Sequence, residues 1–351
     1  MTTPGVISCT CRGGTGRLPN MLAAQLVGFG GPGNLVLTDV PDPEPGPGDV
    51  LIAVAAAAVN NTDINTRTGW YGSGGWSGAV TLPRIQGADV CGRITAVGPG
   101  VPAECIGERV IVEPVLRMVH GTRMQPPWYL GSECDGGFAE LVRVPATNAH
   151  IVHRSLSDLE WASFPCSYST AENLLTRANV GTGDDLLVTG ASGGVGSAVI
   201  QLALARGAQV TAVSSPGKAA AVQALGVDSV LDRTDDPGQD RFDVVVDLVG
   251  GERWPMLLQA LRPRGRLATS GAVAGAEVSL DLRTLYLKDL SLFGGTIIDE
   301  GVFTALVRRI EDGDIAPLVA RSYPLTQIHQ AQADFTARAH VGKIVLSVSA
   351  A

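Results

Sequence analysis

The residues best suited to bind a ligand lie in a glycine-rich turn between an apolar run and an apolar helical pattern. Residues 186–188 predict a strand, and residues 199–204 predict a helix. Such a turn lets backbone N–H groups and a helix N-terminus approach a pyrophosphate more closely than side chains would permit. Glycines also serve ordinary tight turns, but the strand before and the helix after are the setting of a dinucleotide site. The predicted cofactor-binding turn comprises Gly190, Ala191, Ser192, Gly193, Gly194, Val195 and Gly196.

The residues that follow the next predicted strand, 209–213, bear on which dinucleotide binds. A site that prefers NAD usually places Asp or Glu near this strand end, where it bonds the ribose hydroxyls. Neither residue type occurs between positions 210 and 227. Hydroxyl groups and cations suited to a 2′-phosphate come instead from Ser214, Ser215, Lys218 and Arg233. NADP(H) is therefore the expected cofactor, although Lys218 and Arg233 could each be ordinary solvated surface residues.

Length and composition are typical of a two-domain α/β protein. The chain has 351 residues, of which 44 are glycine and 21 proline, and its formal net charge is -8. The negative charge argues against nucleic acid or an anionic membrane as partner, and no apolar run reaches the length of a membrane span. The N-terminus lacks the apolar segment of a secretory signal. We therefore expect a cytoplasmic protein in which residues 1–20 form a disordered leader.

Cysteine and histidine spacing gives no indication of a metal site. The six cysteines, at positions 9, 11, 91, 105, 134 and 166, contain no Cys-x-x-Cys pair, and a cytoplasmic chain is not expected to form stable disulfides. Cys9 and Cys11 could bind a metal in principle, but they lie in the Gly/Thr-rich leader. His150 and His153 are close together, yet none of the five histidines has metal-ligand spacing.

Two patterns of elements position these residues. Strand patterns occupy residues 22–30, 34–40, 49–59, 93–97, 107–112 and 136–142, with a helix start at 60–63. Beyond Leu159 a helix pattern over 163–175 precedes strands near 186–189, 209–213, 229–231, 242–248, 266–270 and 290–294, which alternate with helices. This alternation predicts a parallel sheet with right-handed crossovers. Residues 326–348 predict one last helix and strand.

Together these segments resemble the medium-chain dehydrogenase/reductase superfamily. The resemblance covers residue 22 to the end, and its carriers are GPGDVLIAVAAAAVNNTD, GADVCG, GERV, DGGFAEL, the glycine turn and the terminal GKIVL. The chain is most similar to the zinc-free quinone oxidoreductases, the group that includes zeta-crystallin. The resemblance implies an α/β fold with a discontinuous β-barrel (GroES-like) catalytic domain, residues 21–160 and 306–351. A Rossmann domain, residues 161–305, is inserted into it, and the cleft between the two holds cofactor and substrate.

Departures from the zinc alcohol dehydrogenases indicate the chemistry. By resemblance, the catalytic zinc ligands would fall at Asn60, Ala88 and Cys166, and one thiol cannot hold a zinc that keeps an open position. The lobe for structural zinc is also missing, because Cys134 stands alone in residues 113–136. We therefore expect no metal. Without a Lewis acid an alkoxide is not stabilised, which favours reduction of a quinone or an α,β-unsaturated carbonyl.

The resemblance also implies roles for single residues. Asn60 and Thr170 would face the nicotinamide. The alternatives are that Asn60 caps a helix and that Thr170 is a helix residue whose hydroxyl is hydrogen-bonded locally. Buried carboxylates at Asp63 and Asp89 would need a cation, for which Lys343, near the cofactor in this family, is a candidate.

Tyr71 matches a tyrosine at the family's substrate mouth, where it could donate a proton to the developing oxyanion or stack on a ring. Trp70, Trp76 and Trp128 could extend an apolar pocket or pack as core or lid residues.

The resemblance further implies that Phe293 and Gly294 pass the nicotinamide and that the neighbouring edge strand pairs with a second subunit, as a homodimer. Substrate specificity is expected in residues 70–80 and 116–134. The alternatives are an alcohol dehydrogenase with an unrecognised metal site, and a dinucleotide-binding protein with little turnover.

Overall fold

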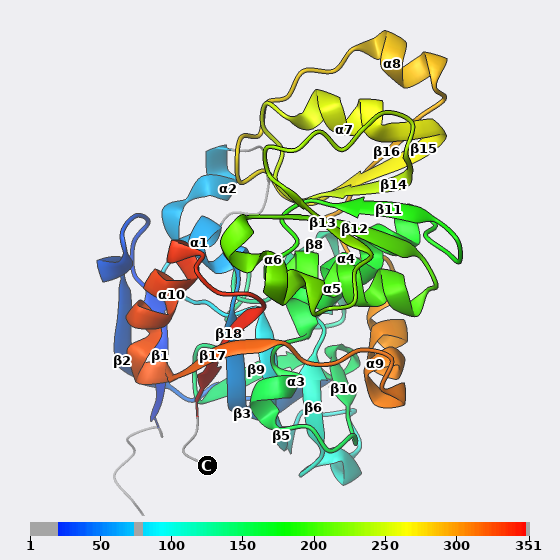
Figure 1. Cartoon of the computed structure of the whole chain (residues 1–351). Coiled ribbons are helices and arrows are strands. Elements are labelled where there is room, and N and C mark those ends of the chain that lie inside the picture. Colours follow the sequence, from blue (N-terminus) through cyan, green and yellow to red (C-terminus); the bar gives the residue numbers. More distant parts are fainter. Residues whose placement is uncertain (1–19, 74–79, 349–351) are drawn as a thin grey trace, which may run out of the picture.

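The chain is organised around two large sheets, which Figure 1 shows below and above the middle of the molecule. The computed structural model describes residues 20–73 and 80–348. The expected leader (apart from its last residue, Asn20), the first two cysteines and Trp76 lie outside the described residues. In the described helices, no segment is long and apolar enough to cross a membrane.

The mainly antiparallel sheet belongs to the first and last parts of the chain. Its strands are β3 (Asp49–Val59), β5 (Asp89–Val97), β6 (Arg109–Val112), β9 (Leu141–Pro145), β10 (Ala149–Ile151), β17 (Val319–Pro324) and β18 (Lys343–Ser347). A smaller sheet of β1 (Asn20–Leu26), β2 (Leu35–Pro41) and β4 (Arg84–Ile85) packs beside it, and β7 (Val115–Val119) pairs with β8 (Thr122–Tyr129). The helices of this part are α1 (Asn61–Thr68), α2 (Trp70–Ser73), α3 (Asp158–Trp161) and α10 (Ile328–Ala337).

The last helix and strand return to the first strands, as the sequence predicted. β18 pairs antiparallel with β3, so the final strand completes the first sheet. α10 lies beside β1 and β2 in Figure 1, where Ile328 and Ala331 share a buried cluster with Ala23 and Leu26. The ring of His329 also contacts the carbonyl of Leu35 at 2.6 Å. These contacts place Lys343, the first residue of β18, at the end of β3.

The second sheet is parallel throughout, in the order β13-β12-β11-β14-β15-β16. Its elements in chain order are α4 (Pro165–Arg177), β11 (Asp185–Val188), α5 (Gly194–Ala205), β12 (Gln209–Ser214), α6 (Pro216–Gln223), β13 (Ser229–Asp232), β14 (Phe242–Asp247), α7 (Trp254–Ala260), β15 (Leu261–Thr269), α8 (Leu282–Leu287), β16 (Ser291–Gly294) and α9 (Val302–Asp312). The predicted α/β class and parallel sheet are confirmed. β15 begins at Leu261, earlier than the predicted strand near 266–270. Pro263 and Gly265 interrupt the apolar pattern of its first half, so the sequence does not reveal that part.

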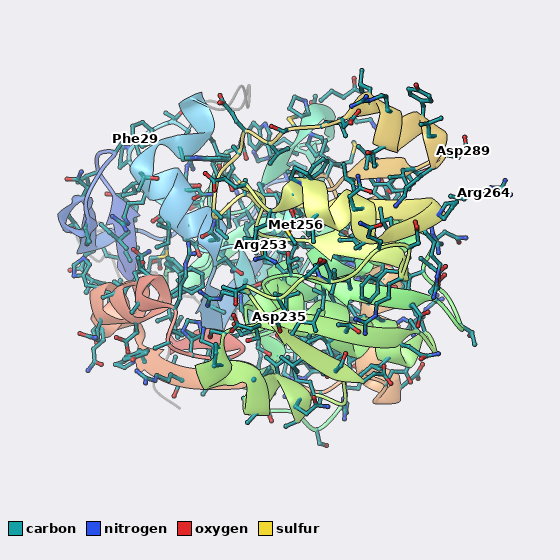
Figure 2. The ribbon with its side chains drawn as sticks, turned by 45° about the horizontal axis from the view of Figure 1, so that its top comes forward. Phe29, Asp235, Arg253, Met256, Arg264 and Asp289 are labelled. Carbon is teal, nitrogen blue, oxygen red and sulfur yellow. The ribbon has the colours of Figure 1, made fainter. Side chains whose placement is uncertain are left out.

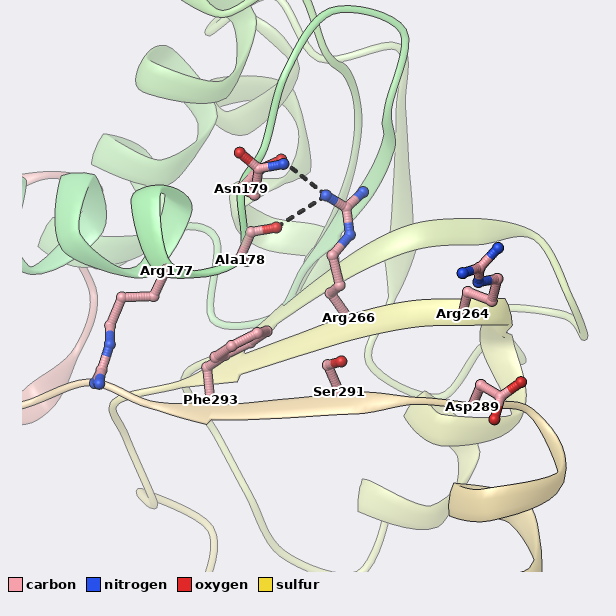
Figure 3. A pocket seen from close by; sticks show the side chains of 8 residues that line it. All are labelled: Arg177, Ala178, Asn179, Arg264, Arg266, Asp289, Ser291 and Phe293. Atoms are coloured by element: carbon pink, nitrogen blue, oxygen red, sulfur yellow. Dashed lines mark hydrogen bonds between the residues drawn. The ribbon is translucent and has the colours of Figure 1, made fainter.

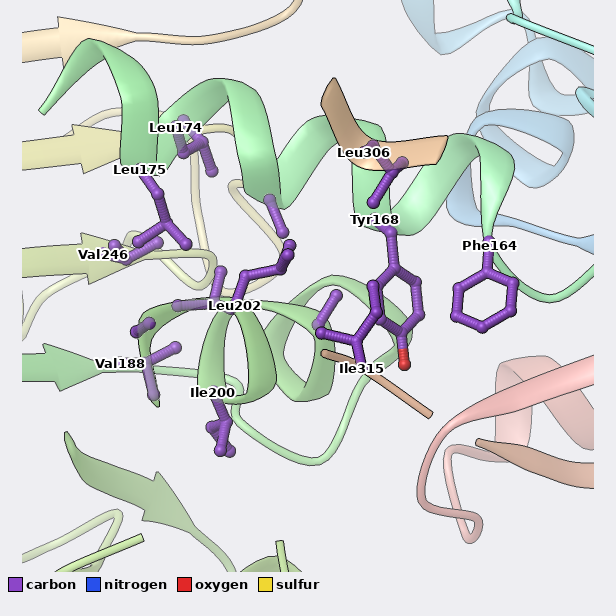
Figure 4. Close-up of a cluster of buried hydrophobic side chains, with 14 of the residues drawn as sticks. Phe164, Tyr168, Leu174, Leu175, Val188, Ile200, Leu202, Val246, Leu306 and Ile315 are labelled. Carbon is purple, nitrogen blue, oxygen red and sulfur yellow. The ribbon is translucent and has the colours of Figure 1, made fainter. Parts of the chain in front are cut away.

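The largest core cluster joins the two parts through α4. Figure 4 shows side chains of α4 and α5 gathered with Val188 and Val246 of the parallel sheet. The same cluster includes Ala56 of the first sheet. Tyr168 and Leu202 are fully buried in it, and burial of one large apolar side chain contributes about 1.5–3 kcal/mol. α4 is therefore held rigidly between the sheets.

One predicted strand begins later than expected. The DGGFAEL segment predicts a strand over 136–142, but β9 begins at Leu141. The preceding glycines instead cross another loop closely, since a Cβ on Gly136 would lie 2.3 Å from the carbonyl oxygen of Gly87. Close backbone packing, which leaves no apolar signature, takes the place of strand pairing here.

Candidate functional site

A cavity with a volume of about 700 Å³ lies at the carboxyl ends of β11, β12 and β14. Ligands of open α/β sheets bind at this edge. Its lining combines the glycine turn, the ends of the parallel strands and the last turn of α10. On the other side it reaches Asn60 at the start of α1 and Lys343 at the start of β18. The cavity therefore lies where the two sheets meet.

The glycine turn forms one wall of this cavity. Gly190, Ser192, Gly193, Gly194, Val195 and Gly196 all line it. Gly190 has a φ of 62°, and a Cβ on Gly196 would lie 2.3 Å from its carbonyl oxygen, so the turn needs glycine at both positions. Gly193 is the N-cap of the twelve-residue helix α5. The unbonded N–H groups of that helix end thus face the cavity, which suits an anionic pyrophosphate.

Ala191 behaves differently from the rest of the turn. It is fully buried in the core cluster of α4 and α5, and the cavity lining found in the described chain does not include it. Its role is to pack the turn against the helices, so only the other six turn residues reach the space where a cofactor would lie.

Predicted phosphate ligands gather at one end of the cavity. Ser214, Lys218 and Arg233 line it, and the ammonium of Lys218 donates a hydrogen bond to the hydroxyl of Ser192 at 3.4 Å. Burial, together with the charges of Arg233 and Arg338, lowers the pKa of Lys218. The three cations are therefore close enough to repel one another, an arrangement that an anion would stabilise.

The hydroxyl of Ser214 gives a second sign that a polar ligand belongs here. Its oxygen is buried and has no hydrogen-bond partner among residues 20–73 and 80–348. Buried polar groups are normally bonded, so a missing partner points to a ligand group. Ser215 does not line the cavity in the described structure: it is the N-cap residue of α6, without a side-chain cap hydrogen bond.

Three basic residues at this end were not predicted from the sequence. Arg253, Arg338 and His340 also line the cavity, together with the acidic Asp235. Figure 2 shows Arg253 and Asp235 near the middle of the molecule, where the guanidinium of Arg253 donates to the backbone carbonyl of Asp235. These residues come from segments far apart in the chain, and only the fold assembles them. No spacing signal could have identified them.

A buried polar cluster closes the inner end of the cavity. The ammonium of Lys343 lies 2.9 Å from a carboxylate oxygen of Asp89, and it also donates to the side-chain oxygen of Asn60 and, at 3.2 Å, to the hydroxyl of Ser167. The amide nitrogen of Asn60 donates to the same Asp89 oxygen at 2.7 Å. The cation expected beside Asp89 is thus Lys343. Ser167, which also lines the cavity, was missed because its sequence neighbourhood shows only a helix pattern.

Asp63 lies beside this cluster with a different partner. Its carboxylate accepts a hydrogen bond from the backbone N–H of Asn60 at 2.7 Å, which caps the start of α1. Burial raises the pKa of Asp63 to about 7, and the charge of Asp89 adds to the increase, while the Asn60 hydrogen bond opposes it. The helix-cap alternative for Asn60 therefore describes its backbone, while its side chain bridges Asp89 and Lys343.

The residues at the catalytic zinc position do not fit that metal. Asn60 presents an amide that is already bonded on both sides, and Ala88 is a buried residue without a ligating atom. Lys343 adds a positive charge at the same place, which opposes a second cation. Within the described residues, no group of three or more His, Cys, Asp or Glu side chains is arranged to hold a metal ion.

The predicted catalytic hydroxyls lie behind this cluster. The hydroxyl of Thr170 donates to the backbone carbonyl of Cys166 at 2.8 Å. This local bond matches the alternative of a helix residue whose hydroxyl is satisfied within its own helix. Tyr71 donates to the hydroxyl of Thr62 at 3.0 Å. Tyr129, which was not predicted, contacts the thiol of Cys166 at 3.4 Å. In the part of the chain described, none of the side chains of Thr170, Tyr71 and Tyr129 lines the 700 Å³ cavity. Burial raises the pKa of the Cys166 thiol to about 12, so the thiol is neutral.

Phe293 and Gly294 were expected beside the nicotinamide, and among the described residues neither is part of the lining of the 700 Å³ cavity. Phe293 lines a separate cavity of about 620 Å³ at the far edge of the parallel sheet, shown in Figure 3 with Arg177 and Arg266. Gly294 ends the edge strand, where its carbonyl accepts a hydrogen bond from Arg177.

Comparisons with known proteins agree with this arrangement. Residues 46–154 match the alcohol dehydrogenase GroES-like domain, and residues 194–312 match the zinc-binding dehydrogenase family. An acryloyl-coenzyme A reductase of Metallosphaera sedula is 31% identical over 324 residues, which cover 88% of this chain and 95% of that protein. A quinone oxidoreductase of Rattus norvegicus is 30% identical over 346 residues, which cover 93% of this chain and 97% of that protein.

A solved structure from Sinorhizobium meliloti, provisionally named an alcohol dehydrogenase, superposes with a TM-score of 0.88. It is 45% identical, and the match covers 93% of this chain and 96% of that one. The chain is a dinucleotide-binding oxidoreductase and belongs to the medium-chain dehydrogenase/reductase superfamily.

Proposed function

We propose that this oxidoreductase uses NADPH to reduce quinones or α,β-unsaturated carbonyl compounds. The observation that carries the proposal is the Lys343–Asn60–Asp89 cluster, whose ammonium group would lie where the resemblance expects a catalytic metal. A substrate reduced here receives no Lewis-acid assistance, so it must delocalise its own negative charge. Quinones and enones do so as phenolate or enolate. The names of the relatives from Metallosphaera and rat support this choice.

The nicotinamide of bound NADPH supplies the hydride, and the chain's own residues bind and orient it. The turn from Gly190 to Gly196 would hold the pyrophosphate. Ser214, Lys218 and Arg233 would bond the 2′-phosphate, with Arg338 close by. Asn60, Ser167 and Lys343 would lie against the nicotinamide end. The basic end of the cavity and the unbonded hydroxyl of Ser214 support NADPH over NADH.

The test is a panel of acceptors and donors followed by loss of cofactor absorbance. Quinones, enones and enoyl thioesters should oxidise NADPH, and simple alcohols should not reduce NADP⁺. Metal analysis of the purified protein separates the alternatives: stoichiometric zinc with alcohol oxidation would replace this proposal by an alcohol dehydrogenase. Tight NADPH binding without turnover on any acceptor would indicate a binding protein.

We also infer that two copies associate through the edge of the parallel sheet. Nothing in the described chain pairs with the outer side of β16. Beside it, α8 exposes Leu282, Tyr286 and Leu287 by 64%, 62% and 72%. An unpaired strand next to an apolar helix is a typical site of association. Sedimentation of the wild-type chain should show a dimer, and Leu287→Glu should yield monomers.

The two-domain division is likewise a proposal. Residues 161–305 hold the parallel sheet, but a boundary at 305 would cut α9, whose Phe303 and Leu306 pack in one cluster with α4. We therefore place the end of the dinucleotide-binding unit after α9, at residue 312. Limited proteolysis should cleave near residues 313–318 rather than within the helix.

A further inference from the structure

The β7–β8 hairpin occupies the segment where substrate specificity was expected. It begins at Val115 and ends at Tyr129, which are paired in the hairpin register. Residues 298–302, which follow the parallel sheet, hold it from the other side. Val115 packs with Ile298 and Val302, and Tyr129 packs against the same cluster. The hairpin therefore connects the two parts of the molecule near the site.

Polar contacts fix the hairpin in this position. The guanidinium of Arg117 is 2.6 Å from the carboxylate of Glu113 and also donates to the backbone carbonyl of Ile298. At the end of β8, the backbone N–H of Tyr129 donates to the carboxylate of Glu133 at 2.8 Å. These bonds set the backbone from which the Tyr129 ring extends.

The hydroxyl of Tyr129 differs from its neighbours in the strength of its contact. It lies 3.4 Å from the thiol of Cys166, and a thiol is a weak donor and a weak acceptor. The other hydroxyls of this region have oxygen partners: Tyr71 donates to Thr62 and Thr170 donates to the Cys166 carbonyl. An incoming oxygen acceptor can thus displace the contact of Tyr129 at the least cost.

This hydroxyl also lies next to the polar cluster that lines the cofactor cavity. The backbone N–H of Cys166 donates to Asp89 at 2.6 Å, and the other oxygen of Asp89 bonds Asn60 and Lys343. Ser167, the next residue of α4, lines the cavity itself. Tyr129 is thus linked to the cluster of Asn60, Asp89 and Lys343 through Cys166, and a substrate carbonyl would reach its hydroxyl by extending from the cavity past Ser167.

We propose that Tyr129 donates a hydrogen bond to the carbonyl oxygen of the substrate, in place of its contact with Cys166. The assignment rests on the proposed reduction of a quinone or enone. When hydride adds to the acceptor carbon, the carbon–carbon π electrons move toward the carbonyl and the negative charge comes to reside on its oxygen. The hydroxyl of Tyr129 stabilises that oxygen and keeps its own proton, and water supplies the proton that completes the product.

The environment of Tyr129 agrees with a donor that stays protonated. Burial, with smaller contributions from Cys166 and Tyr71, raises the pKa of its hydroxyl well above the ordinary value. A neutral, desolvated hydroxyl is an effective donor to a developing oxyanion.

The test compares Tyr129→Phe with Tyr71→Phe and with Tyr168→Phe. Tyr168 is a matched control, because its buried hydroxyl donates to the Ala316 carbonyl and does not belong to the site. Binding of p-nitrophenolate, read from its absorbance, reports the hydrogen bond to an anionic oxygen without turnover. Kinetics with NADPH and a quinone then give kcat, KM and the pH profile.

We expect Tyr129→Phe to weaken p-nitrophenolate binding by about 10- to 100-fold and to lower kcat by about 100-fold, with unchanged affinity for NADPH. Tyr168→Phe should lower the melting temperature alone. Wild-type values of kcat and p-nitrophenolate affinity in Tyr129→Phe would overturn the assignment. A loss confined to Tyr71→Phe would overturn it in favour of Tyr71.

A second variant guards against a folding defect in the first. Cys166→Ala keeps the Tyr129 hydroxyl and removes only the thiol, so p-nitrophenolate binding should persist. Loss of binding in Cys166→Ala would assign the anion contact to the thiol and overturn the proposal. If none of the acceptors tested supports NADPH oxidation by the wild-type protein, the proposed function fails. The p-nitrophenolate comparison then still decides the role of the hydroxyl.

Discussion

The ammonium of Lys343 lies 2.9 Å from the carboxylate of Asp89, and their side chains are 3% and 0% exposed. The pair joins the last strand of the chain to β5 in the interior of the first sheet. Neither charge reaches water, so each depends on the other and on Asn60. Breaking such a pair by removing one partner leaves an uncompensated buried charge.

Lys343→Met should therefore destabilise the protein by about 3–5 kcal/mol at neutral pH. Urea unfolding followed by far-UV circular dichroism measures the change. The double variant Lys343→Met, Asp89→Asn removes both charges and should recover much of the loss. An equal loss in the single and the double variant would show that packing, rather than charge, holds the two strands.

Asp63 makes stability depend on pH in a defined direction. The pKa of its carboxyl rises from 3.8 to about 7 on folding, so between these values the folded state binds a proton that the unfolded state has released. Its contribution to stability is complete below about pH 4 and is lost as the pH rises through about 7. At about 1.4 kcal/mol per pKa unit, the loss is on the order of a few kcal/mol.

Asp63→Asn tests this dependence, because the amide oxygen can still accept the Asn60 N–H hydrogen bond that caps α1. The free energy of unfolding of the wild type should decline relative to that of Asp63→Asn between about pH 4 and about pH 7. Parallel curves for the two proteins over that range would mean that Asp63 keeps an ordinary pKa.

The basic end of the cavity should decide between the two dinucleotides. Lys218→Ala and Arg233→Ala should each weaken NADPH binding by about 10- to 100-fold, and NADH binding much less, because a hydrogen bond to a charged phosphate contributes about 1.5–3 kcal/mol. Arg241→Ala is the control, since Arg241 directly precedes β14, at the amino ends of the parallel strands and so opposite the cavity. Fluorescence titration measures both affinities. Equal losses for NADH and NADPH would place these cations at the pyrophosphate.

Much of the architecture could be predicted because it depends on local patterns. The alternation from 185 to 294 gives each parallel strand within a few residues, and the Asn60–Asp63 capping signal marks the start of α1 where the structure has it. Lys343 was identified as a partner for a buried carboxylate because its position follows from the family motif.

The rest of the site depends on contacts between distant segments. Tyr129 and Cys166 are separated by 37 residues, and although residues 116–134 and Cys166 were each singled out, nothing in the sequence pairs them. Arg338 reaches Lys218 only because α10 ends in a left-handed residue that turns the chain toward α6. The lining of a second cavity by Phe293 could not be predicted, because a short edge strand does not reveal what packs beside it. Such placements follow from tertiary packing and not from periodicity.

The glycine turn offers the most direct test of how the cofactor site is built. A Cβ on Gly196 would lie 2.3 Å from the carbonyl oxygen of Gly190, whereas a Cβ on Gly193 would meet that same oxygen at 3.5 Å, an ordinary contact. Gly196→Ala must therefore push the turn away from α5, and we expect a loss of about 1–3 kcal/mol in the free energy of unfolding, as for other overpacked sites.

Gly193→Ala is the control, because it makes the same change in chain entropy. Its free energy of unfolding should lie within about 1 kcal/mol of the wild-type value. Urea unfolding without cofactor measures both variants. Equal stability of the two would mean that the turn can relax around an added methyl group, and that its glycines serve the approach of the pyrophosphate alone.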